Sequence, residues 1–354
     1  MSKYVVFTAV LTLALMAGWG CEQKSANVAM STPPPAAAVA QKPAAAPTPT
    51  EPNTVEVKPE PAKIEQPTPP EPNKPEKVTP PQNITEQPKT TPPAASTTAA
   101  QLCDKCTEFL GKYVNRDGMV DYKTLSRKKL ELASLLDKFR GVNRSDYNSW
   151  SKDDKLAFWI NAYNLELIKI IVENYPIESN RMLRLFWPPN SIKHIKGIWD
   201  EHKFIIMDEE FTLKEIEQRF FQNELSEPRV IFAMSYASIS GVPLRNEAYC
   251  GRNLSEQLDD QVKKFIAGSH AFKIDREKQT VSLSSLLNPT WYGGQFVAKY
   301  GTDLKFKQQE PAVRAVLHFL TKYIPQQDID YLETGNYTIE YLRYDWTLNE
   351  GAGQ

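Results

Sequence analysis

The feature that most constrains the fold is an abrupt change of composition near residue 100. Residues 22–100 hold 19 of the 27 prolines and contain no Phe, Trp or Tyr. Such a segment cannot bury enough apolar surface to offset the entropy of ordering its backbone. We therefore expect a disordered, Pro/Ala/Thr-rich tether over 22–100. Its reach is on the order of 200 Å if fully stretched as polyproline II. One folded domain should occupy residues 101–354.

Residues 1–21 have the pattern of a signal peptide. Lys3 gives a short positive start, and the nearly all-apolar run Val5–Met16 is too short to span a bilayer. Small residues precede Cys21, which resembles the lipidated Cys of a bacterial lipoprotein, although Gly18 and Trp19 depart from the usual pattern. Cleavage nearby without a lipid is the alternative. We predict an extracytoplasmic lipoprotein, in the periplasm or at the cell surface, whose membrane partner is reached through Cys21.

The charge balance argues against nucleic acid as a partner, because the formal net charge is −1 and there is no basic excess. The sequence has no metal-ligand cluster, phosphate loop or dinucleotide fingerprint, so we predict no cofactor and no metal. An unknown envelope protein or a small ligand is the expected partner besides the membrane.

Two segments define the expected core. Asp153–Asn174 has apolar residues at helical spacing, with Phe158 on the opposite face, so we expect a helix buried nearly all round. Val230–Met234 is a continuous apolar run, typical of a central strand covered on both faces. Thr212 and Glu215 form a capping-box pattern at the start of another helix.

The remaining segments mix helices and strands without regular βαβ alternation. This favours an α+β class, a single mixed helical and sheet domain with a buried central helix and a central strand. Helices are expected at 103–114, 122–139, 213–222, 253–266, 294–300 and 311–323, and strands at 203–207, 210–213, 271–275, 280–283 and 337–346.

Several segments in the right order resemble one family, the domain of unknown function 547, over about residues 105–350. The most specific is Lys155–Asn164 (KLAFWINAYN), and the others are Gly118–Tyr122, Phe211–Glu217, Pro243–Arg245 with Tyr249, and Tyr344–Asn349. The resemblance implies little about activity, because this family has no settled biochemistry.

The resemblance also draws attention to an unusual loop. The family usually carries a His and two Cys there, and a His beside a Cys resembles an activated thiol. This chain has Ile231, Tyr236 and Gly241 at those positions. Either the domain has lost its chemistry and kept a cleft, or those residues were structural and nothing was lost.

Serine is the alternative nucleophile in this loop. Ser235, Ser238 and Ser240 follow the expected strand, but no Gly-x-Ser-x-Gly elbow is present. A serine needs a neighbouring base, and His194 or His202 would have to approach in space. Otherwise these serines cap the turn.

Four further polar residues belong to the candidate cleft. Asn161 and Asn164 lie three apart on the central helix, so they either orient a ligand or tie the helix to the loop at 235–245. Arg245 and Asp345 either form a buried ion pair or offer Arg245 to an anionic group. The complete candidate cleft is Asn161, Asn164, Ser235, Tyr236, Ser240, Arg245 and Asp345.

The cysteines give weak signals. Cys103 and Cys106 form a CxxC on an expected helix, without a second CxxC for zinc. They are a candidate local disulfide or two quiet thiols, which leaves Cys250 alone. A redox role would require an exposed Cys of low pKa. Two aromatic pairs, Phe186–Trp187 and Trp291–Tyr292, either line a groove or anchor loops.

These patterns together favour a non-catalytic binding or scaffolding module, anchored in the envelope and derived from a cysteine-bearing family. The alternative is a hydrolase or transferase with an unrecognised Ser-centred site, with Ser235 or Ser240 as nucleophile. A base within hydrogen-bond reach of either serine would distinguish the two.

Overall fold

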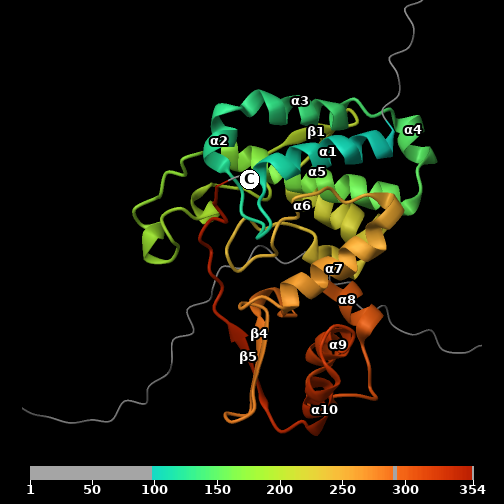
Figure 1. Cartoon of the computed structure of the whole chain (residues 1–354), viewed down its shortest axis with the longest axis vertical. Helices are drawn as coiled ribbons and strands as arrows, with labels where there is room; N and C mark the ends of the chain where they lie inside the picture. The colour runs from blue at the N-terminus through green and yellow to red at the C-terminus, as the bar shows by residue number, and fades with distance from the viewer. Residues whose placement is uncertain (1–97, 290–292, 353–354) are drawn as a thin grey trace, which may run out of the picture. The chain divides into compact units, whose positions relative to one another are not determined.

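The computed structural model describes residues 98–289 and 293–352, and Figure 1 shows their arrangement. The predicted signal peptide, Cys21 and the tether up to residue 97 lie outside the described residues and stay predictions. Trp291 and Tyr292 lie outside them as well. The described residues combine helices with two small sheets, which confirms the predicted α+β class.

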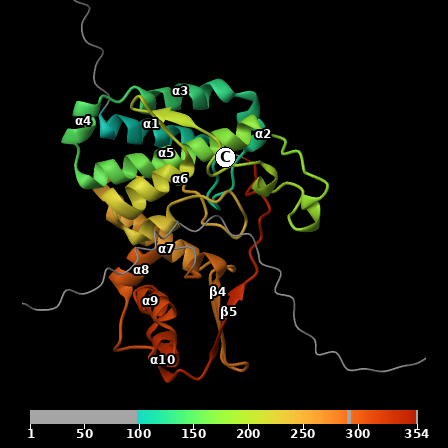
Figure 2. The same cartoon turned by 180° about the vertical axis from the view of Figure 1, so that it is seen from behind.

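The centre of the helical layer is α5 (Lys152–Glu173), the predicted 153–174 helix. Ser151 caps its first turn, with Asp154 N donating to Ser151 Oγ at 3.0 Å. Its neighbours on successive faces are α1 (Ala99–Tyr113), α3 (Lys129–Arg140) and α6 (Leu213–Ile216), as Figures 1 and 2 show from opposite sides. The helix is therefore buried nearly all round, as its apolar pattern predicted.

Other helices differ from the predicted bounds for local reasons. The first begins at Ala99 rather than residue 103, because Thr98 and Gln101 form a capping box. The predicted helix over 122–139 is two helices, α2 (Tyr122–Arg127) and α3, because Lys128 leaves the helical conformation at φ −117° and ψ 34°. A short helix that we did not predict, α4 (Arg144–Ser149), begins after Asn143.

The predicted hairpin after residue 203 is present as β1 (Phe204–Ile206) and β2 (Glu209–Phe211), paired antiparallel. The predicted capping box is also present, since Glu215 N donates to Thr212 Oγ1 at 3.2 Å and Thr212 N donates to Glu215 at 2.7 Å. It begins α6, which continues as an eight-residue π-helix, η3 (Glu217–Glu224). Such wide turns are rare and are frequent at functional sites.

The C-terminal part contains a three-stranded sheet of order β3–β4–β5. The strands are β3 (Phe272–Asp275), β4 (Thr280–Ser284) and β5 (Thr338–Leu342), with β3 antiparallel and β5 parallel to β4. The helices of this part are α7 (Leu254–Ile266), α8 (Gly293–Tyr300), α9 (Pro311–Leu320) and α10 (Gln326–Thr334). Short 3-10 turns connect the elements: η1 (Leu183–Leu185), η2 (Ile192–His194), η5 (Gly251–Asn253) and η6 (Ser285–Leu287).

The predicted central strand at 230–234 was wrong. The segment is a 3-10 helix, η4 (Pro228–Phe232), packed against α7. Glu227 caps it, with Arg229 N donating to the Glu227 carboxylate at 3.0 Å, and Pro228 fixes a helical φ at its first position. A short apolar run does not distinguish a buried strand from a buried helical turn.

Among the described residues, no helix has the length and apolar character required to cross a bilayer.

Candidate functional site

The two asparagines of α5 act as backbone clamps. Asn164 Nδ2 donates to Ala233 O at 2.9 Å, and its Oδ1 accepts from Ser235 N at 2.8 Å. Asn161 repeats the pattern one turn earlier, with Nδ2 donating to Tyr249 O at 2.7 Å and Oδ1 accepting from Tyr249 N at 3.0 Å. Both amides are buried. Of the two predicted roles, Asn164 performs the one that ties the helix to the loop at 235–245, through Ser235, whereas Asn161 ties it to Tyr249 beyond that loop.

The loop serines are also buried and bonded to their surroundings. Ser235 Oγ accepts from Ala237 N at 3.1 Å, and Ser240 Oγ accepts from Asp345 N at 2.9 Å. Ser238 Oγ shares a hydrogen bond with the Tyr344 hydroxyl at 2.7 Å. These bonds connect the loop to itself and to the chain after β5, so the serines stabilise turns, as expected for capping residues.

The histidines that we considered as bases bond elsewhere. His194 Nε2 lies 2.8 Å from Pro188 O, and His202 Nε2 lies 3.1 Å from Lys196 O. Within the described residues, neither Ser235 nor Ser240 has a side-chain hydrogen bond to an imidazole or a carboxylate. The structure therefore does not assemble the Ser–His pair that a hydrolase would need.

Ile231, Tyr236 and Gly241, the three loop positions singled out from the sequence, lie in a closely packed environment. Ile231 is partly buried, and Tyr236 is buried with its ring 6.1 Å from that of Trp199. A Cβ atom added at Gly241 would lie 2.9 Å from Ser238 Oγ and 3.1 Å from the Tyr344 hydroxyl. The space for a side chain at 241 is thus taken by the Ser238–Tyr344 pair and the Ser238 backbone, so the loop is packed closely around a glycine.

A polar cluster surrounds Tyr236 on its α5 side. Burial raises the pKa of Tyr236 well above its usual value, and the nearby Glu217 carboxylate raises it further. The same two causes raise the pKa of Tyr163, whose buried hydroxyl has no hydrogen-bond partner. Burial in turn raises the pKa of Glu217 to about 7. We did not predict this cluster, because Glu217 belongs to a π-helix that the sequence pattern does not reveal.

The predicted Arg245–Asp345 ion pair was wrong. Arg245 instead pairs with Glu247 and Asp260, each at 2.5 Å. Asp345 Oδ1 accepts from Thr347 N at 2.9 Å, and the backbone N–H of Asp345 donates to Ser240 Oγ at 2.9 Å. The two residues serve separate contacts, and Arg245 already has two carboxylate partners, so it is not held free for an external anion.

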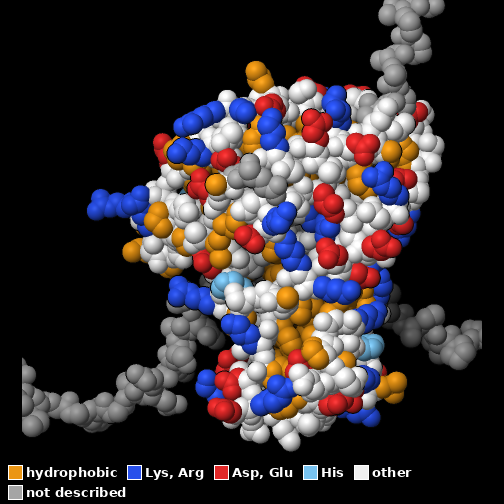
Figure 3. Space-filling view, viewed as in Figure 1, with side chains coloured by type: hydrophobic (Ala, Val, Ile, Leu, Met, Phe, Trp, Pro, Cys, Tyr) orange, Lys and Arg blue, Asp and Glu red, His pale blue; other side chains and the backbone are white. Residues whose placement is uncertain are grey.

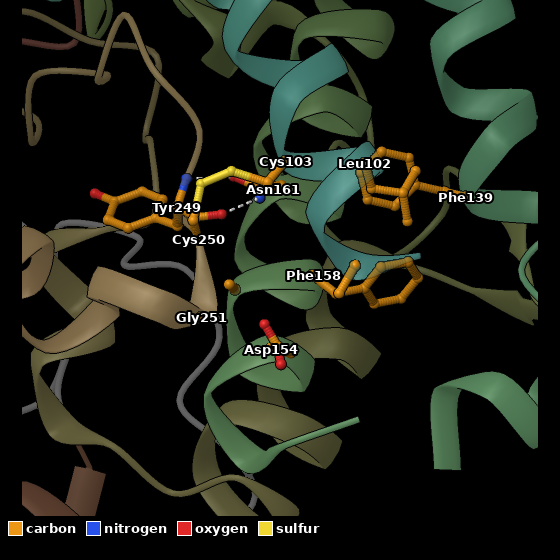
Figure 4. A pocket seen from close by; sticks show the side chains of 11 residues that line it. Leu102, Cys103, Phe139, Asp154, Phe158, Asn161, Tyr249, Cys250 and Gly251 are labelled. Carbon is orange, nitrogen blue, oxygen red and sulfur yellow. Dashed lines mark hydrogen bonds between the residues drawn. A yellow bond between two sulfur atoms is a disulfide. The ribbon is translucent and has the colours of Figure 1, made fainter. Parts of the chain in front are cut away.

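The cysteine pairing also differs from the prediction. Cys103 of α1 forms a disulfide with Cys250, and Cys106 is a buried free thiol. Burial raises the pKa of the Cys106 thiol, which disfavours the reactive thiolate. Pairing at a sequence separation of 147 follows from the fold, because Asn161 holds Tyr249 next to α1 (Figure 4). Sequence alone does not give connectivity.

A narrow pocket lies beside this disulfide (Figure 4). Its volume is about 10 Å³, and Asp154, Asn161 and Gly251 are among its lining residues. A Cβ at Gly251 would lie 2.0 Å from the Asp154 carboxylate, so glycine is what allows α5 to approach here. Such a space holds about one water molecule, which excludes it as a substrate site in this form.

A second, wider opening lies over β2, α6 and η3, with a volume of about 630 Å³. Its charges are already paired: Arg219 bonds Glu224 at 2.9 Å and also Glu209, which in turn bonds Arg144 at 3.0 Å. No group of His, Cys, Asp or Glu suited to a metal ion occurs in the described ranges. The acidic and basic side chains of this groove are thus held in ion pairs with one another.

Most of the candidate-cleft residues thus form junctions between segments rather than the lining of an open cleft. Asn161 is joined to Tyr249, Asn164 to Ser235 and Ser240 to Asp345, and Tyr236 lies buried in the same loop. The fold and these junctions define a class: an α+β domain in which one buried helix clamps irregular loops through asparagine side chains.

Residues 147–266 match the family model "Protein of unknown function, DUF547". The matched range contains α5, both asparagine clamps and the loop at 233–241. No curated protein and no solved structure matches the chain.

Proposed function

We propose that this chain is a non-catalytic binding or scaffolding module of the bacterial envelope, derived from a cysteine-bearing family. The observation that supports it is the state of the loop at 233–241. Its serine hydroxyls bond to backbone N–H groups or to Tyr344, and Gly241 leaves no room for a thiol. A hydrolase needs a nucleophile beside a base with access to substrate.

The anchoring part of the proposal rests on sequence. Residues 1–21 would direct export, Cys21 would carry the lipid, and residues 22–100 would be a disordered proline-rich tether. The module would then be an extracytoplasmic lipoprotein, held at the membrane through its acyl chains. Its partner would be an envelope protein or a small ligand. Because five of the seven predicted cleft residues are buried, and Arg245 is already paired with Glu247 and Asp260, the binding surface would lie elsewhere on the domain.

The catalytic alternative is tested with a fluorophosphonate probe, which reacts with activated serines. The full-length chain should show no stoichiometric labelling, and neither should the S235A and S240A variants, because each hydroxyl accepts from a backbone N–H and neither is hydrogen-bonded to a side-chain base in the described residues. Labelling of the natural chain that disappears in S235A or S240A would overturn the non-catalytic proposal.

The anchor is tested by fractionation of bacteria that produce the full-length chain or the variant C21S. The natural chain should incorporate labelled palmitate and sediment with membranes. The variant should lose the label, because the thioether to the lipid forms at that Cys. A natural chain that takes up no palmitate would contradict the lipoprotein assignment without affecting the conclusion about the serines.

A further inference from the structure

Exposed apolar side chains concentrate in the loop of residues 177–190, between α5 and η2. Met182 is 77% exposed, Leu185 81% and Phe186 63%. Other large apolar side chains that are exposed in the described ranges, such as Leu130 and Leu304, occur singly. Single exposed apolar residues are normal, whereas a cluster of them indicates a contact surface.

The backbone of this loop is ordered by its own hydrogen bonds. Asn180 Oδ1 accepts from Met182 N at 2.9 Å, and Leu183 O accepts from Phe186 N at 3.0 Å. Residues 182, 185 and 186 are three and four positions apart, so one helical turn presents them on the same side. The exposure is therefore built into the turn.

Both ends of the loop are attached to the domain. Trp187 packs edge-on against Trp346 at 6.1 Å, and Leu348 N donates to Asn190 O at 3.3 Å. At the other end Ile177 packs against the core. In Figure 1 the segment is the yellow-green loop that projects at the left, away from the helices around α5. The apolar turn thus lies at the end of a firmly held projection.

The 177–190 loop carries two arginines beside its exposed apolar residues. Arg181 makes no ion pair within the described residues, and Arg184 donates to Ser179 Oγ at 2.6 Å without a carboxylate partner there. Glu178 is the single acidic residue of 177–190. Figure 3 shows basic and apolar side chains together on this side of the molecule. Two arginines that lack carboxylate partners beside an apolar turn favour an anionic, partly apolar partner.

We propose that the 177–190 loop docks on a phospholipid bilayer leaflet that carries anionic headgroups. Met182, Leu185 and Phe186 enter the boundary between headgroups and acyl chains, while Arg181 and Arg184 contact phosphates. An interfacial element inserts to a depth of about 5–10 Å, which suits a single exposed turn. Basic residues near an anionic leaflet add a salt-dependent attraction.

The shape of the loop favours a bilayer over a protein. A stable protein interface covers about 800 Å² on each partner and needs a matching surface. A projecting turn with three apolar tips offers a small convex contact, and a fluid interface adapts to it without a preformed pocket. This docking goes beyond the proposed lipid anchor, because it does not depend on Cys21.

The test uses the chain from Glu22 onward, which lacks the predicted signal and lipid site but retains the tether and the entire described core, Leu102 to Leu348. It is sedimented with vesicles of phosphatidylcholine, with or without phosphatidylglycerol. We expect binding to the anionic vesicles that weakens with added salt. The variant M182S/L185S/F186S should lose at least about tenfold in affinity, because its apolar contact is removed.

Matched controls separate this loop from general surface effects. L304S and L130S remove equally exposed leucines elsewhere and should leave vesicle binding unchanged. R181Q/R184Q should bind the two vesicle types more equally than the natural loop does, because the charge attraction is lost.

Equal binding by the natural chain and the triple serine variant, or no binding by either, would overturn the proposal. So would a loop contact found only with an envelope protein. C21S fractionation is a separate readout, so failure of the anchor leaves this result standing.

Discussion

Two irregular segments are attached to the helical layer around α5, and they differ in which side chains they bury. The segment at 233–250 buries serines and backbone amides, whereas the 177–190 loop exposes Met182, Leu185 and Phe186. The difference follows from where each backbone finds its partners. Asn161 and Asn164 supply hydrogen bonds to the first segment inside the core, so it can leave water. The second is attached at its ends and forms its own turn. In these two segments, burial of the backbone depends on whether it finds hydrogen-bond partners in the core, and not on the polarity of the side chains.

The disulfide should have the largest effect on the buried segment. C103S or C250S removes the bridge that holds the Tyr249–Cys250 backbone against α1, and we expect a loss of about 4 kcal/mol of unfolding free energy, because a long loop of chain is no longer closed. Urea unfolding measures it. C106S is the matched control, since it alters a buried thiol without a bridge. Peptide mapping that finds Cys106 bridged to Cys103 would refute the pairing.

Removal of one clamp should be the next largest effect. N164A leaves Ala233 O and Ser235 N unpaired in the core, and each buried orphan costs about 1–3 kcal/mol. We expect about 3 kcal/mol of destabilisation in denaturant unfolding. N148A, on the exposed side of α4, should be nearly neutral. A cost for N164A no larger than that for N148A would mean that the loop is not held in place by the clamp.

Glu166 is a third buried polar side chain on α5, after Asn161 and Asn164, but unlike them it makes no hydrogen bond that satisfies its buried oxygen. Its Oε2 is buried without a hydrogen bond, and burial raises the pKa of Glu166 to about 7, with Lys169, Glu173 and Arg140 as its charged neighbours. The folded state therefore binds more protons than the unfolded state between pH 4.5 and about 7, so stability falls as pH rises through that window. E166Q should remove this fall.

The expected gain for E166Q is about 2 kcal/mol above pH 7 and none below pH 4.5, since one pKa unit corresponds to about 1.4 kcal/mol and relaxation reduces the full value. Thermal unfolding across pH measures it. E108Q, at an exposed site on α1, is the control. Parallel pH profiles for the natural chain and E166Q would show that this carboxyl ionises freely in the folded protein.

Refilling position 241 should have a smaller effect. G241A brings a Cβ to 2.9 Å from Ser238 Oγ, and overpacking of this kind costs about 1–2 kcal/mol. The same substitution in an S238A background should cost less, because the nearest atom is gone. A double-mutant cycle measures this coupling. An additive result would show that the Ser238 hydroxyl does not occupy the space that a side chain at position 241 needs.

Sequence patterns predicted what depends on local order. The α5 helix, both hairpins and the Thr212–Glu215 capping box follow from apolar spacing and cap chemistry. They also predicted that the two asparagines could tie the helix to a loop, although not to which backbone groups.

What the sequence missed depends on long-range packing. Pro228–Phe232 is a 3-10 turn because its burial comes from α7 and not from strand neighbours. The Cys103–Cys250 bridge joins residues that only the folded chain brings together. Arg245 finds Asp260 on α7, a partner no motif indicates. The exposure of Met182 and Leu185 also depends on tertiary structure, because apolar residues of these types would be predicted from sequence to lie in the core.

The smallest expected effect sharpens the comparison most. M182S/L185S/F186S should change the unfolding free energy by less than about 0.5 kcal/mol, because side chains that are already exposed lose little burial. Trp187 and Asn190 keep the loop ends attached in this variant. Urea unfolding without vesicles provides the measurement. A loss as large as that for N164A would mean that the apolar turn packs against the domain in solution, and the contrast between the two segments would fail. A neutral result would leave this exposed cluster without a role in folding, which is what a surface kept for an external partner requires.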